Sequence, residues 1–113
     1  MGEDFYLATF EESLAYFEAL ASASDRVELV EVGRTSFGRS AYIALISSAE
    51  NLRNVERYRE ISQRLAHPEG LSDAEARALA REGKAIVHID GGLHASEVAH
   101  AQHTIQLAYD LAV

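Results

Sequence analysis

The chain of 113 residues contains no cysteine, no tryptophan and a single proline. Without cysteine, disulfide bonds and thiolate metal sites are excluded, so that any bound metal must be held by His, Asp or Glu. No apolar run approaches the roughly 18 residues that indicate a transmembrane helix, and we expect no membrane span. The residues that follow Met1 also lack the basic start and the apolar stretch of a signal peptide.

Positive charge is scarce as well. The chain has 10 Lys and Arg against 18 Asp and Glu, which gives a formal net charge of −8. This balance argues against nucleic-acid binding, which needs clustered cations facing phosphates, and against a polybasic membrane patch. Apolar residues nevertheless make up 48% of the chain, which is enough for a packed core and atypical of a disordered protein.

The first part of the chain has the pattern of a helix followed by a hairpin. Thr9 and Glu12 have the spacing of a capping box, which predicts that a helix covers residues 9–23. Residues 26–32 and 41–47 are strand-like, and a short connection containing glycine joins them. Two strands with such a link predict a β-hairpin.

The middle of the chain has the pattern of two charged helices. Residues 54–66 repeat apolar positions at helical spacing and end before the only proline. Ser72 and Glu75 form a second capping box, which predicts a helix over 73–81. Gly83 is expected to end that helix as a glycine in the C′ position.

The last part of the chain has the pattern of an α/β unit. Residues 85–89, Ala-Ile-Val-His-Ile, predict a buried strand, and residues 90–94 form a Gly-rich loop. A final helix is expected to begin near Ser96, with an apolar face made of Val98, Ala101, Ile105, Ala108 and Ala112. Because ligands in open α/β sheets bind beyond the carboxyl ends of strands, the loop is a candidate site.

His94 and Glu97, which lie at the junction of this loop and the final helix, are the residues that could bind a metal. Their i, i+3 spacing allows both side chains to face one crevice, and imidazole and carboxylate are both good Zn²⁺ ligands. Two ligands bind weakly, since a catalytic zinc needs a third protein ligand and an open position for water. Pairs of this kind also occur on many solvated helices, so the spacing by itself leaves a purely structural role open.

Two neighbouring residues are candidates for support of such a metal. Asp90 could accept a hydrogen bond from a metal-bound imidazole, or it could form an Asx turn with the glycines that follow. His100 could likewise contact the ligands from the final helix, or have a structural role. His103 is expected to point away from the apolar face of that helix.

Three segments together resemble the M14 family of zinc carboxypeptidases. The first is Tyr16–Leu20, which resembles the leading helix of the family. The second is residues 33–47, Gly-Arg-Thr-Ser-Phe-Gly-Arg-Ser and the strand after it, which resemble the "G-x-[ST]-x-x-G-R" hairpin. The third is residues 90–97, Asp-Gly-Gly-Leu-His-Ala-Ser-Glu, which resemble the "G-x-H-[AG]-x-E" zinc motif. Their order and spacing agree over essentially the whole chain.

The resemblance implies an α/β/α fold around a mixed sheet, of which residues 1–113 would be the N-terminal, incomplete segment. It implies Zn²⁺ as cofactor, His94 and Glu97 as the first two ligands, and a peptide or protein substrate. In the family the third ligand, the general base and the substrate-binding arginines come later and have no counterpart here. We therefore expect no catalytic residue in this chain and no peptidase activity from it alone. The resemblance also suggests an extracellular or periplasmic protein.

Two alternatives stay open on the sequence. One is a related zinc-dependent deacylase of N-acyl amino acids, which would bind zinc through the same His-x-x-Glu motif but would have a different substrate pocket. The other is a non-catalytic α/β interaction module in which His94 and Glu97 are merely solvated. Residues 51–83 have the pattern of a helical insertion between strands.

Overall fold

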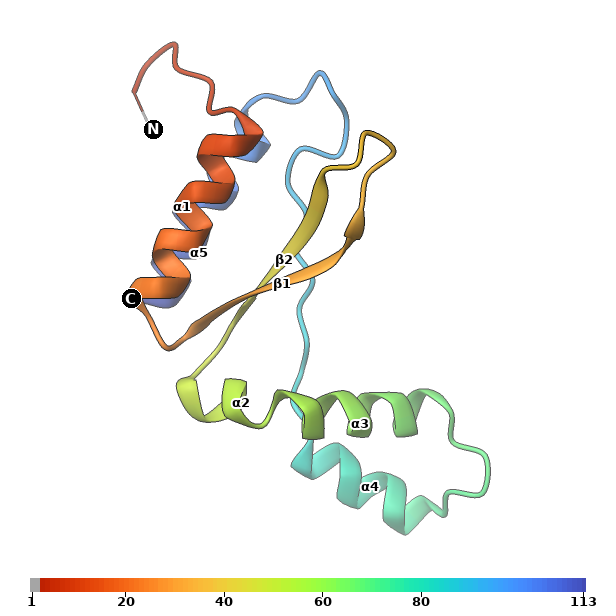
Figure 1. Ribbon diagram of the computed structural model, residues 1–113. Coiled ribbons are helices and arrows are strands. Elements are labelled where there is room, and N and C mark those ends of the chain that lie inside the picture. The colour runs from red at the N-terminus through yellow and green to blue at the C-terminus, as the bar shows by residue number, and fades with distance from the viewer. Residues whose placement is uncertain (1–2) are drawn as a thin grey trace. The chain divides into compact units, whose positions relative to one another are not determined.

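The computed structural model describes residues 3–113, which form two compact units. One unit contains the chain up to Leu52 together with Ile89–Val113, and the other is Arg53–His88. Figure 1 shows the order of the elements: α1 (Phe10–Ala23), β1 (Val27–Arg34), β2 (Ser40–Ile46), α2 (Ala49–Arg53), α3 (Val55–Ala66), α4 (Asp73–Glu82) and α5 (Ala99–Ala112). The predicted mixture of helices and strands is confirmed, and the described strands form one two-stranded antiparallel sheet.

The predicted start of α1 is confirmed by its hydrogen bonds. The backbone N–H of Glu12 donates to the Thr9 hydroxyl over 3.2 Å, and the Thr9 N–H donates to the Glu12 carboxylate over 2.8 Å. These bonds satisfy backbone N–H groups that have no partner within the helix. The helix then buries Leu20 and half-buries Phe17.

The predicted β-hairpin is also confirmed. β1 and β2 pair antiparallel from Val27 opposite Ile46 to Arg34 opposite Ser40, and the register shifts between Glu31 and Gly33. Such a bulge bends the strand near the end of the ladder.

The core of this unit lies between α1, the hairpin and α5. Leu20, Val27, Ala108 and Ala112 are buried together, and Ile105 is buried as well. In Figure 1, α5 runs alongside α1. The predicted apolar face of the final helix is therefore right for its later residues. It is wrong for Val98 and Ala101, which are exposed, because the core begins one turn further along at Ile105.

The second unit is a pair of helices, α3 and α4, with one fully buried side chain. Ile61 is 1% exposed, and the Arg57 guanidinium binds both carboxylate oxygens of Glu82 at 2.7 and 2.9 Å. The predicted capping box of Ser72 and Glu75 is present.

Gly83 follows α4 as predicted, but in a different conformation from a C′ glycine. Its φ of −62° and ψ of 174° are those of an extended rather than a left-handed conformation. A Cβ at this position would lie 3.0 Å from Cγ2 of Ile61 and 3.2 Å from the carbonyl oxygen of Leu79. The close approach of α3, and not a positive φ, is therefore what favours glycine here.

The predicted strand over residues 85–89 is wrong. These residues have no regular structure, and Ile86, Val87 and Ile89 are 72%, 78% and 52% exposed. A strand needs backbone partners on a neighbouring strand, and within residues 3–113 the sheet consists of β1 and β2 alone. Over the same residues, no helix combines the length and the apolar character that crossing a membrane requires.

Candidate metal centre

His94 and Glu97 lie on a turn that leads into α5. The backbone N–H of Glu97 donates to the carbonyl oxygen of His94 over 3.0 Å. The helix begins only at Ala99, so the predicted start near Ser96 is three residues too early. The reason is local, because the Glu97 side chain folds back onto His94 and stabilises a separate turn.

The turn brings the two predicted ligands into direct contact. Nδ1 of His94 lies 2.6 Å from Oε1 of Glu97, and the backbone N–H of His94 donates to Oε2 over 3.1 Å. The His94 side chain is 70% exposed and that of Glu97 is 29% exposed. Both donors are therefore adjacent to each other and accessible from solvent.

These hydrogen bonds also lower the pKa of the Glu97 carboxylate. The bond from the His94 ring, followed by the bond from the His94 backbone N–H, holds the pKa of Glu97 below its usual value, and the nearby charge of His100 adds to this effect. Glu97 is ionised at neutral pH as an ordinary Glu is, and its lowered pKa keeps it ionised to a more acidic pH. That is the state in which a carboxylate binds a metal.

The pair fits part of the zinc site that the family resemblance implies. Zn–N and Zn–O bonds are about 2.0–2.2 Å long, so two donors of one ion lie roughly 3 Å apart. Nδ1 of His94 and Oε1 of Glu97, which lie 2.6 Å apart, would have to separate slightly to bind one ion. No group of three or more His, Cys, Asp or Glu side chains placed to hold a metal occurs within residues 3–113. His94 and Glu97 would thus hold Zn²⁺ from one side.

The other predicted residues lie nearby but in different settings. Asp90 is exposed in the loop before His94, and His100 is exposed in the first turn of α5. Their supporting roles stay predictions. His103 is exposed further along α5.

Sequence reasoning missed a contact between this loop and α5, in which Gly91 lies against Thr104. These residues are far apart along the chain, and their spacing leaves no periodic signal.

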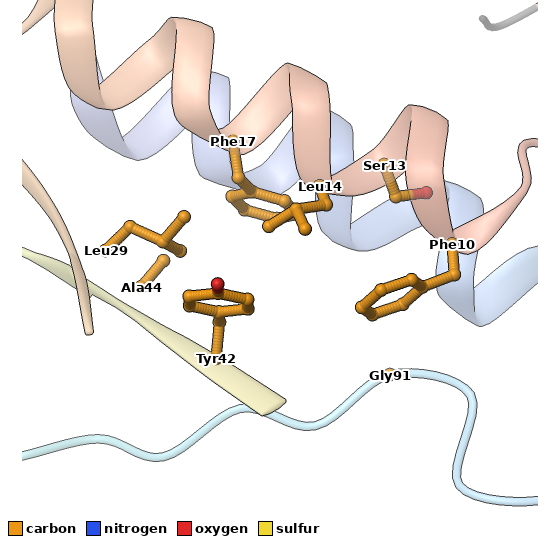
Figure 2. Close-up of a pocket in the computed structure, with 8 residues that line it drawn as sticks. All are labelled: Phe10, Ser13, Leu14, Phe17, Leu29, Tyr42, Ala44 and Gly91. Carbon is orange, nitrogen blue, oxygen red and sulfur yellow. The ribbon is translucent and has the colours of Figure 1, made fainter. Parts of the chain in front are cut away.

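The same loop borders an open crevice of about 310 Å³. Figure 2 shows side chains of α1 on one wall and Tyr42 and Ala44 of β2 on the other, with Gly91 at the edge. The lining residues are Phe10, Ser13, Leu14, Phe17, Leu29, Tyr42, Ala44 and Gly91. Because this lining contains no carboxylate and no imidazole, the crevice adds no metal ligand to the turn.

Comparison with known proteins places the chain in a family. No curated protein and no solved structure matches the chain. The family model of the zinc carboxypeptidases, Peptidase_M14, matches residues 13–113, which include most of α1, the hairpin and the His94–Glu97 turn. This match covers far more than half of the sequence and agrees with the resemblance carried by its motifs. The chain therefore belongs to the M14 family of zinc carboxypeptidases.

Proposed function

We propose that this chain forms part of a zinc-dependent carboxypeptidase-type hydrolase in which His94 and Glu97 are two of the protein ligands of the metal. The observation that supports the proposal is the 2.6 Å contact between Nδ1 of His94 and Oε1 of Glu97. It sets a nitrogen and an oxygen donor side by side on an accessible turn, within a chain of the zinc carboxypeptidase family.

The local structure favours metal binding by this pair in two ways. The His94 backbone N–H binds Oε2 of Glu97, which restrains the carboxylate while Oε1 faces the imidazole. The lowered pKa of Glu97 keeps the carboxylate free of a proton to a more acidic pH than an ordinary Glu.

The chemistry of the proposed enzyme is hydrolysis of a peptide bond. Zn²⁺, when bound, would supply Lewis-acid activation of the carbonyl and of a water molecule. In this chain, His94 and Glu97 would hold and orient the ion. The third ligand and the general base are assigned to no residue among 3–113, since no third donor side chain converges on this pair.

The competing interpretation is an interaction module in which the same contact is an ordinary surface ion pair. Exposed pairs of this kind contribute little to stability and occur without any metal. This interpretation predicts that replacing His94 leaves metal binding unchanged, which makes the two interpretations separable.

The experiment is a Zn²⁺ titration by calorimetry of the 113-residue chain and of three variants. His94→Ala and Glu97→Ala are each expected to weaken binding by more than about tenfold. His103→Ala is the matched control, because His103 is an exposed histidine of the adjoining helix. It is expected to bind like the unaltered chain.

A second measurement decides the case of weak binding. Cu²⁺ binds nitrogen and oxygen sites more tightly than Zn²⁺, and it broadens NMR signals close to it. Broadening centred on His94 and Glu97 would support the proposed site. Equal broadening at every histidine, or broadening centred on His103, would contradict it.

A further inference from the structure

Gly91 lies in unusually close contact with α5. A Cβ built on Gly91 would lie 2.3 Å from Cγ2 of Thr104 and 2.8 Å from the carbonyl oxygen of His100. Carbon atoms in contact are ordinarily about 3.5–4.0 Å apart. Any side chain at this position would therefore push the loop away from the helix by about 1 Å.

Neither neighbour of Gly91 can easily move aside. The His100 oxygen belongs to the helix backbone. The Thr104 hydroxyl donates to the carbonyl oxygen of Ala101 over 2.8 Å, and this bond selects one rotamer for the β-branched side chain. In that rotamer Cγ2 faces Gly91. Turning the methyl group away would break the hydrogen bond of the hydroxyl.

The next residue continues the same contact. Gly92 has a φ of +78°, and a Cβ there would lie 3.5 Å from Cβ of Ala101. The backbone thus lies against α5 at two successive residues. The positive φ of Gly92, which L side chains disfavour, turns the chain toward His94.

From this contact we infer that Gly91 and Thr104 position the His94–Glu97 turn against α5. The inference rests on the proposed function in taking this turn as a metal half-site. Gly91 lies only three residues before His94, so a displacement of the loop would also move the His94 imidazole. Metal ligands must be held within about 0.5 Å of their productive positions. Gly91 and Thr104 touch no metal donor and are positioning residues.

The first test needs no metal and therefore does not depend on the proposed function. The ¹⁵N signals of the His94 ring report its contact with Glu97, and the variant Glu97→Gln defines the signals of the weakened contact. In the metal-free chain, Gly91→Ala is expected to shift the ring signals toward those of Glu97→Gln. Unchanged ring signals in Gly91→Ala would overturn the inference.

A double variant separates positioning from loss of folding. Thr104→Ser removes Cγ2 and keeps the hydroxyl, so alone it is expected to loosen the contact and to shift the ring signals less than Gly91→Ala does. Combined with Gly91→Ala, it should return them part of the way, since the clash with the His100 oxygen remains. Amide exchange of Leu20 and Ala108 in the core should stay as in the unaltered chain. Loss of that protection, or no return in the double variant, would assign Gly91→Ala a structural effect only.

The second test uses Zn²⁺. Gly91→Ala is expected to weaken binding by about 10- to 100-fold, the effect typical of residues that orient metal ligands. Binding of Zn²⁺ that Gly91→Ala leaves unchanged would overturn the inference while leaving the proposed function intact. If the unaltered chain binds no metal at this turn, the proposed function fails and the ring signals alone decide the positioning.

Discussion

Replacing Ile61 by alanine should unfold the helix pair α3–α4 and leave α1, the hairpin and α5 folded. Ile61 is 1% exposed and is the largest fully buried side chain among the described residues. The substitution removes the side-chain carbons beyond Cβ, at roughly 0.8 kcal/mol per carbon. Together with the cavity that remains, the expected loss is about 3 kcal/mol.

This loss is large compared with the stability that the unit can have. Arg53–His88 is shorter than the roughly 40 residues below which a core seldom supports independent folding. The exposed ion pair of Arg57 and Glu82 adds little, since such pairs contribute at most about 1 kcal/mol. We therefore expect the burial of Ile61 to supply much of the stability of α3–α4.

Hydrogen exchange followed by mass spectrometry measures both parts of this prediction. A loss of about 3 kcal/mol corresponds to amide exchange in α3 and α4 that is faster by up to roughly 100-fold, the limit being the exchange rate of an unfolded chain. Ile61→Val is the matched control and should accelerate exchange by about tenfold or less. Equal exchange of α3 in Ile61→Ala and the unaltered chain would refute the assigned burial. Equal acceleration in α1 would refute the independence of the two units.

Two further predictions concern the turn. Hydrogen bonds from His94 lower the pKa of Glu97, so the carboxylate should titrate at a lower pH than an ordinary Glu. The stabilisation from these bonds should be complete above a pH of about 4.3 and should be lost as the pH falls through the lowered pKa. NMR titration of the Glu97 carboxyl carbon measures this, and His94→Ala should move the midpoint upward; an unchanged midpoint contradicts the assignment. The 113-residue chain with added Zn²⁺ should not hydrolyse peptides, since no third donor joins His94 and Glu97 within the described residues; robust turnover that His94→Ala abolishes would disprove this.

Local features of this chain were predictable from its sequence. The capping boxes at Thr9 and Ser72 depend on residues three apart, and both are present. The hairpin between β1 and β2 depends on two apolar runs and the short connection between them. His94 and Glu97 are close together as expected from their spacing, even though the helix begins later than predicted. The reason is that a turn, like a helix, brings residues three apart together.

Two predictions failed where neighbouring atoms differed from what the sequence pattern implied. Residues 85–89 have the composition of a buried strand, but a strand forms only beside another one, and these residues are exposed. Gly83 has the position of a C′ glycine, yet its φ is negative and the nearby Ile61 accounts for the missing side chain. In both cases the sequence pattern was present and the neighbouring atoms decided the conformation.

The sequence by itself determined which chemistry this chain can offer and where its local elements begin. It identified a nitrogen and a carboxylate donor at and just after the end of the Gly-rich loop, the absence of thiolate ligands, and the motifs of the zinc carboxypeptidase family. Only the tertiary structure decided that Gly91 packs on Thr104 and that Ile61 is the largest fully buried side chain among the described residues. The physical reason is that hydrogen bonds between near neighbours follow from residue spacing, whereas burial and close approach depend on atoms that the chain brings together only when it folds.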